Sequence, residues 1–199
     1  MISEFFVEVI SLIRSDGMDT TEVLREVRNF VEDTEVEDVV VASTSGETGL
    51  EAAKSLDGLD VNLVVVGHCT GFDEENEQEM SDERRGRIEE LGGKVLIGTM
   101  VSHNINIAIK ERAGFSTHEM FSNMLRLFGQ GTKVALEDVL MACDAGLVDS
   151  GKDVVSVAGT GSGADTALLV RSANSMNLFD SRIKEVILKP AKVKNLPFY

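Results

Sequence analysis

Two short segments combine glycine with hydroxyl side chains, and they are the part of this sequence best suited to binding chemistry. The first comprises Ser43, Thr44, Ser45, Gly46, Glu47 and Thr48. It lies between a valine-rich run and a helical stretch, so its hydroxyls and the free N–H groups of the first helical turn can surround a phosphate. A helix N-terminus favours an anion by roughly 0.3–2 kcal/mol. Glu47 would repel a phosphate unless its carboxylate turns away, and the alternative for this segment is an ordinary capped helix start.

The second segment comprises Gly159, Thr160, Gly161, Ser162, Gly163, Asp165 and Thr166. Its closely spaced glycines predict backbone N–H groups aimed at a ligand rather than a simple turn. The spacing of Gly159, Gly161 and Ala164 also fits the dinucleotide fingerprint G-x-G-x-x-G/A, which requires a following helix and a further strand. The short remaining chain begins instead with a strand-like stretch. We therefore expect a phosphate-binding loop and no dinucleotide site.

Two more small, polar segments, residues 67–72 and 98–104, follow β-rich runs. From them we expect a pocket wall that includes His68, Gly71, Phe72, Thr99 and Met100. The alternatives are a structural role for His68 and a simple helix N-cap at Ser102. Cys69 is next to His68, but neighbours on a strand point to opposite faces, which argues against a nucleophilic cysteine.

The charge balance limits the partners of this 199-residue chain. It has 19 basic and 34 acidic side chains, for a formal net charge of -15. Such a surface repels nucleic acid and anionic membranes, so a bound phosphate must be held by local dipoles and donors. The acidic run at 73–79 is interpreted as a solvated loop or a lid. Cys69 and Cys143 fit neither a metal-site spacing nor a disulfide spacing, which favours reduced thiols in the cytoplasm.

The pattern of elements predicts an α/β fold. β-rich runs occupy residues 38–42, 61–66, 94–97 and 153–157, and further strands are expected at 166–171 and 185–188. Helical segments between the first four runs predict a parallel sheet. Start signals for these helices are the capping-box pairs Asp19/Glu22 and Ser116/Glu119, together with Ser81 and Thr132. Ligands of such sheets bind beyond the carboxyl ends of the strands, where the polar segments lie.

Both ends of the chain look available for contacts. Residues 1–16 carry apolar side chains at helical spacing, so we expect an amphipathic N-terminal helix that either docks on the domain or contacts another subunit. It is too short to span a bilayer. Residues 189–199 are expected to form a frayed tail or a strap over a neighbour. We therefore expect residues 1–199 to form a single α/β domain and a homo-oligomer.

Four stretches together resemble the C-terminal α/β domain of pyruvate kinase, and more closely a family of small, stand-alone archaeal proteins with that fold and no settled function. They are VASTSGETGLEAA (41–53), GHCTGF (67–72), GQGTKVALEDVLMACDAGLV (129–148) and GTGSGADTALLV (159–170). The resemblance covers roughly residues 35–190. After the third strand, relatives carry a His-x-x-Ser-Gly-type segment followed by Arg. This chain has Met100, His103, Asn104 and Ile107 in that region.

The resemblance implies a three-layer αβα sandwich with a mostly parallel mixed sheet, without the catalytic barrel of the enzyme. It also implies a phosphorylated cofactor, with flavin mononucleotide (FMN) as the leading candidate. Its phosphate would sit on residues 43–48, backed by residues 161–165, and His68, Phe72 and the segment around Thr99 would face the remainder. The main alternative is a regulatory or assembly module that senses a sugar phosphate. A small-molecule kinase or phosphatase is disfavoured, because the loops offer no clear pair of carboxylates for magnesium.

Overall fold

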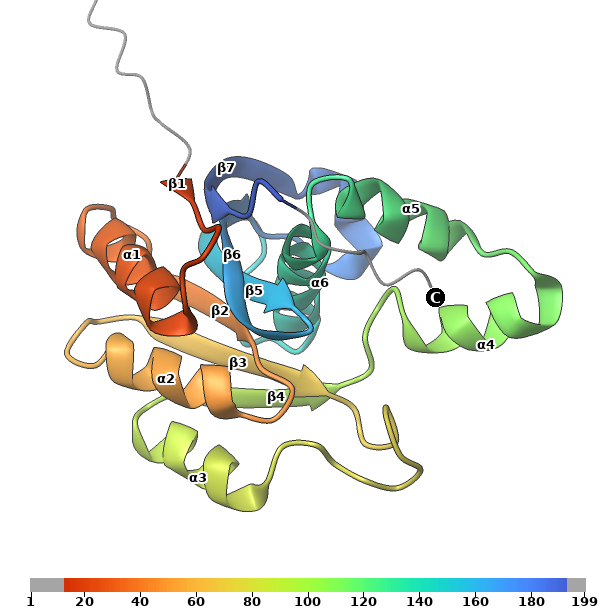
Figure 1. Cartoon of the computed structure of the whole chain (residues 1–199), viewed down its shortest axis with the longest axis horizontal. Helices are drawn as coiled ribbons and strands as arrows, with labels where there is room; N and C mark the ends of the chain where they lie inside the picture. Colours follow the sequence, from red (N-terminus) through yellow and green to blue (C-terminus); the bar gives the residue numbers. More distant parts are fainter. Residues whose placement is uncertain (1–12, 193–199) are drawn as a thin grey trace, which may run out of the picture.

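The computed structural model describes residues 13–192, which are built around one seven-stranded sheet of order β1-β7-β6-β5-β2-β3-β4 (Figure 1). The strands are β1 (Ile13–Arg14), β2 (Asp38–Ala42), β3 (Asn62–His68), β4 (Lys94–Gly98), β5 (Asp153–Thr160), β6 (Ser162–Arg171) and β7 (Arg182–Lys189). β5, β2, β3 and β4 run parallel to one another. β6 is antiparallel to both β5 and β7, and β1 is parallel to β7. The prediction of a mostly parallel mixed sheet is confirmed.

The valine run of β2 lies at the centre of the sheet, where both faces are covered. Val39, Val40 and Val41 have no exposed surface. Val39 and Val41 point into one hydrophobic cluster and Val40 into the other, as the alternation of a strand requires. A strand that is covered on both faces needs apolar side chains on both. A continuous valine run in the sequence therefore predicts such a strand.

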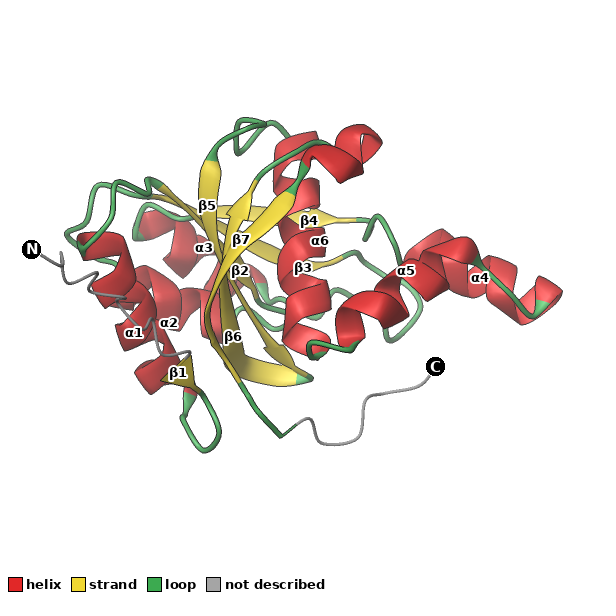
Figure 2. Cartoon of the chain, turned by 90° about the horizontal axis from the view of Figure 1, so that it is seen from above, coloured by secondary structure: helices red, strands yellow, loops and turns green. Residues whose placement is uncertain are grey.

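Helices form a layer on each face of the sheet, so the predicted three-layer sandwich is also confirmed. The helices are α1 (Thr20–Glu32), α2 (Glu47–Ser55), α3 (Asp82–Glu90), α4 (Asn104–Ala113), α5 (Thr117–Arg126) and α6 (Gln130–Asp144), with a 3-10 turn η1 (Ser175–Asp180). α1, α2 and α3 pack on one face, whereas α6 covers the other. α5 packs on α6, and α4 projects away from the sheet (Figure 2). None of the described helices has the length and apolar character needed to cross a membrane.

The predicted helix starts differ in how they are capped. At α1 the capping box is complete: Glu22 N donates to Asp19 (2.9 Å), and Asp19 N donates to Glu22 (3.0 Å). Ser81 caps α3. Ser116 precedes α5 but makes no cap hydrogen bond, and Glu119 pairs with Lys110 rather than completing a capping box. α6 starts at Gln130, two residues before the predicted Thr132.

The chain ends depart from the sequence-based expectation. The N-terminal helix predicted for residues 1–16 is wrong at its described end, because Ile13 and Arg14 form strand β1 beside Leu188 and Lys189. The remainder of that prediction falls on residues 1–12, which lie outside the described part of the chain. In the expected tail, Lys189 completes β7, and residues 193–199 again lie outside the described part. Pairing with strand β7, rather than apolar periodicity, determines the structure of residues 13–14.

Candidate functional site

The carboxyl ends of β2 and β5 form the point at which the strand order of the sheet reverses. From β2 the chain moves outward to β3 and β4, and then returns to place β5 on the opposite side of β2. Ligands of open α/β sheets bind in the crevice that such a reversal creates. A cavity of about 460 Å³ lies here, between the loop after β2, the turn after β5 and helix α6. This volume is within the range of about 300–1,000 Å³ that is usual for small-molecule sites.

Most of the residues predicted from the sequence line this cavity. They are Ser43, Thr44, Ser45, Glu47, Thr48, His68, Phe72, Met100, Gly159, Gly161, Ser162 and Gly163. The remaining predicted residues do not line it: Gly46, Gly71, Thr99, Thr160, Asp165 and Thr166. The four strand-end segments therefore do meet, and the cavity adds residues from α6 and α5 that the sequence reading did not include.

The loop after β2 has a geometry that only glycine satisfies at position 46. Gly46 precedes α2 with a left-handed backbone (φ +87°). A Cβ there would also lie 3.0 Å from Met80 Cγ and 3.1 Å from Arg84 Cβ. Ser43 Oγ accepts a hydrogen bond from Gly49 N (3.0 Å), which closes the loop over the start of α2. The first N–H groups of α2 have no intrahelical partners, and Ser43 satisfies that of Gly49. Glu47 and Thr48 of this turn line the cavity.

The glycine-rich segment after β5 is the turn of a β-hairpin. Thr160 pairs with Ser162 across Gly161, which has φ +85°. The two arms approach so closely that a Cβ on Gly159 would lie 2.3 Å from Gly163 O. Because an antiparallel strand and not a helix follows, the dinucleotide fingerprint lacks the element it needs. The hairpin offers backbone groups to the cavity without forming a phosphate loop of its own.

Asp165 and Thr166 have a structural role beside the N-terminus of α6. Thr166 Oγ1 donates to Asp165 Oδ1 (2.6 Å). Gly131 in the first turn of α6 lies directly against them, since a Cβ there would be 2.2 Å from Thr166 Oγ1. The start of α6 is thereby held close to the hairpin, which brings a second helix N-terminus to the cavity. Gln130 and Lys133 line the cavity from this turn.

A buried ion pair on α6 holds the segment that follows β4. Lys133 and Glu137 are each 3% exposed, and Lys133 Nζ donates to Glu137 Oε2. Glu137 Oε1 also accepts from Ser102 N (2.7 Å) and Ser102 Oγ (2.6 Å). Burial raises the pKa of Glu137, but the charge of Lys133 and these hydrogen bonds outweigh it, so the pKa is lowered overall. Ser102 is thus an anchor of the cavity wall, whereas His103 occupies the N-cap position of α4.

Asp138 is a buried carboxyl group that lines the cavity one residue further along α6. It is 4% exposed, and its Oδ2 has no hydrogen-bond partner. Burial, followed by repulsion from Glu137, raises the pKa of Asp138 well above its ordinary value. The raised pKa favours the protonated carboxylic acid, which can donate a hydrogen bond to a ligand.

Aromatic rings and a second polar pair form the wall opposite α6. The rings of His68 and Phe72 have centroids 3.9 Å apart, and those of Phe72 and His103 are 5.4 Å apart. His68 Nδ1 lies 2.8 Å from Glu79 Oε2, so the last residue of the acidic run contributes to the site. Burial and the nearby charge of Lys133 lower the pKa of His103, which favours a neutral imidazole.

The structure gives Cys69 a structural contact. Its sulfur accepts a hydrogen bond from Asn104 Nδ2 (2.9 Å), and Cys69 is absent from the cavity lining. Within residues 13–192, no group of three or more His, Cys, Asp or Glu side chains is arranged to hold a metal ion.

Several lining residues were not predicted from the sequence, because they lie outside the glycine loops. Arg126, Gln130, Lys133 and Asp138 lie on α5 and α6, far along the chain from any glycine loop. Lys133 and Glu137 have the i, i+4 spacing of a common surface pair. The only available signal was the presence of four charged side chains, those of Lys133, Glu137, Asp138 and Asp144, in a largely apolar helix.

No protein-family model matches the sequence. Among solved structures, the chain is similar to a pyruvate kinase from Cryptosporidium parvum, with a TM-score of 0.40 and 13% identity, covering 77% of this chain and 23% of that one. It is also similar to an O-ureido-L-serine synthase, with a TM-score of 0.31 and 20% identity, covering 64% and 47% of the two chains. The chain thus spans less than half the length of these proteins. At these TM-scores the similarity carries no conclusion about function.

Proposed function

We propose that this chain binds a phosphorylated small molecule in the cavity between β2, β5 and α6, with FMN as the leading candidate. The observation that carries the proposal is the meeting of two helix N-termini, those of α2 and α6, with a glycine hairpin around one cavity. Such termini present unpaired N–H groups and a partial positive charge. They suit a phosphate in a protein whose net charge of -15 opposes anions elsewhere.

The remainder of the ligand would extend along α6. Gln130, Val134 and Asp138 recur every fourth residue and line the cavity, so they form one face about 12 Å long. At its far end the neutral carboxyl of Asp138 would donate a hydrogen bond to a carbonyl or ring nitrogen. Phe72 and Met100 would contact a flat ring. FMN combines a terminal phosphate with a planar ring that carries carbonyl groups, and when bound it would supply electron or hydride transfer.

The resemblance to the stand-alone archaeal proteins with a pyruvate kinase C-terminal-like fold supports the same ligand class. The four stretches that carry the resemblance include both loops at the phosphate end of the cavity and the whole of α6. The proposal is one of binding, and it assigns no group of the protein the role of acid, base or nucleophile.

A sugar phosphate is the second candidate ligand, and the polarity of the cavity favours it. Three carboxyl groups, those of Glu47, Glu79 and Asp138, line the cavity together with His68 and Arg126. Side chains of this kind can accept and donate hydrogen bonds to the hydroxyls of a sugar. The protein would then be a regulatory or assembly module without a chromophore.

The decisive experiment measures the visible spectrum and native mass of the purified protein, and then its affinity for FMN, riboflavin and inorganic phosphate. We expect FMN to bind at least about tenfold more tightly than riboflavin, because hydrogen bonds to a charged group contribute about 1.5–3 kcal/mol. Gly46→Ala should abolish this preference. Gly58→Ala is the matched control, because Gly58 also has a left-handed backbone but lies in open space.

Each outcome distinguishes the candidates. Equal binding of FMN and riboflavin would refute the phosphate site, whereas no binding of either would refute the flavin assignment. Competition by sugar phosphates, in a protein that does not bind FMN, would move the second candidate to first place.

A further inference from the structure

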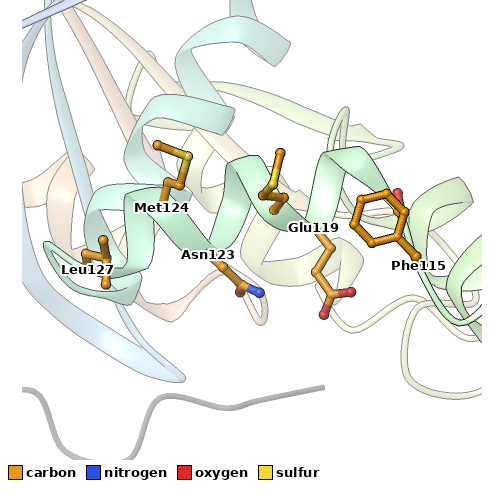
Figure 3. A pocket seen from close by; sticks show the side chains of 7 residues that line it. Phe115, Glu119, Asn123, Met124 and Leu127 are labelled. Atoms are coloured by element: carbon orange, nitrogen blue, oxygen red, sulfur yellow. The ribbon is translucent and has the colours of Figure 1, made fainter.

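Helix α5 has an apolar face that nothing in the described structure covers. One face packs inward: Ser122 and Arg126 are buried, and Phe121 and Leu125 pack on the core between α6 and the sheet. On the opposite face, Phe115 just before the helix is followed by Met120, Met124 and Leu127 (Figure 3). These four residues, which we call the α5 stripe, are 56–79% exposed.

The α5 stripe forms a continuous hollow along the helix. The residues that line it recur at helical spacing, and the hollow has a volume of about 410 Å³. The polar members of this lining are Ser116, Glu119 and Asn123. Glu119 is neutralised by Lys110, whose Nζ donates to its Oε1 at 2.6 Å. The stripe therefore presents apolar side chains without an unpaired charge.

The preceding helix adds to the apolar surface of this region. In α4 only Asn106 is buried, whereas Ile105 and Ile109 are 71% and 46% exposed. Monomeric proteins rarely expose contiguous apolar patches of more than a few hundred Å². With Phe128, the arm formed by residues 104–128 has seven large exposed apolar side chains, which is typical of a surface that is covered by a partner.

The charge distribution identifies a second copy of this chain as the partner that fits. Residues 104–128 carry three basic and two acidic side chains, so the remainder of the chain carries 16 basic and 32 acidic ones. Two copies therefore repel each other over most of their surface but not at this arm. Self-association is favoured at the place where like-charge repulsion is weakest and apolar area is greatest.

We propose that the chain forms a symmetric dimer in which the α5 stripe of each copy packs against that of the other. With the twofold axis perpendicular to α5, the two helices are antiparallel, so the phenylalanine end of one stripe meets the leucine end of the other. The stripe is about 18 Å long. A stable interface takes about 800 Å² from each partner, so the stripe alone is too small and the interface also needs exposed apolar side chains such as Ile105 and Ile109 of α4.

The test is the oligomeric state of the full chain, measured by sedimentation velocity and native mass spectrometry over a dilution series. Met124→Glu places like charges across the twofold axis and should weaken the dimer at least about tenfold. Met176→Glu is the matched control, because Met176 is 96% exposed on η1, which packs at the opposite end of α6. Circular dichroism checks that each variant is folded.

A wild-type dimer that Met124→Glu dissociates and Met176→Glu leaves intact supports the proposal. A wild-type monomer at about 500 µM would overturn it, since interfaces weaker than millimolar contribute less than about 4 kcal/mol. A dimer that survives both Met124→Glu and Met120→Glu would also overturn it, because the interface would then lie elsewhere. A monomer whose stripe is nevertheless protected from oxidation would show that another segment of the same chain occupies it.

Discussion

Replacing Glu137 by glutamine keeps the shape of the side chain but removes the negative charge that faces Lys133. Both side chains are 3% exposed, so the ammonium group cannot regain its lost hydration. Leaving one member of a buried pair without its partner costs about 3–5 kcal/mol. The amide oxygen can still accept the hydrogen bonds from Ser102, so we expect a loss at the lower end of this range, about 3 kcal/mol.

A double-mutant cycle in urea separates the pair from its surroundings. Lys133→Met should cost a similar amount, and the double variant should recover at least about 2 kcal/mol of the summed losses. The matched control is the half-exposed i, i+4 pair Arg85 and Glu89 on α3, whose coupling should be only about 0.2–1 kcal/mol. A coupling below that of the control pair would refute the reasoning, because it would mean that the α6 pair is solvated.

Three further predictions concern α6 and the cavity wall. The pKa of Asp138 is raised on folding above its ordinary value of 3.8. Its contribution to stability is therefore present at low pH and is lost as pH rises from 3.8 through the pKa of the folded state. The melting temperature of Asp138→Asn should accordingly rise relative to that of wild type as pH increases. Gly131→Ala should lower the free energy of unfolding by about 1–3 kcal/mol, because the new Cβ meets Thr166. Gly86→Ala in α3, which meets nothing, should instead raise it by about 0.5–1 kcal/mol in the same urea titration. His103 should titrate below its ordinary pKa of 6.5 in an NMR pH series, and an unshifted or raised value would contradict the burial argument.

The parts of the fold that the sequence predicts are those in which local pattern and tertiary environment agree. Residues 38–42 are apolar on both faces because both faces are covered, and the predicted and observed strand bounds coincide. β3 and β5 extend past their predicted ends, through His68 and Thr160, because ladder pairing rather than side-chain type ends a strand. The start of β6 at Ser162 was missed for the same reason, since its glycines have no strand preference.

The candidate site was predictable on its glycine side and hidden on its helical side. Glycine and hydroxyl residues at strand ends identify Ser43 to Thr48 because backbone geometry leaves a sequence signature. Lys133, Glu137 and Asp138 leave only a weak signature, their charge in a largely apolar helix, because the same charges on another helix would face solvent. Only the packing of α5 and of the segment at Ser102 buries them. Pairing across the sheet likewise placed Ile13 in a strand that periodicity could not reveal.

The two loops at the phosphate end of the cavity are more than 100 residues apart in the sequence, and they meet only because β5 inserts beside β2 in register. Contacts of such long range form late, since the cost of closing the intervening chain must be met first. During synthesis the site cannot exist until β5 has left the ribosome and β6 has closed the hairpin. A ligand would therefore bind only the completed domain, and its concentration would shift the balance between finished and partly folded chains. A chain with ligand bound in the cavity would thus be one that has completed folding.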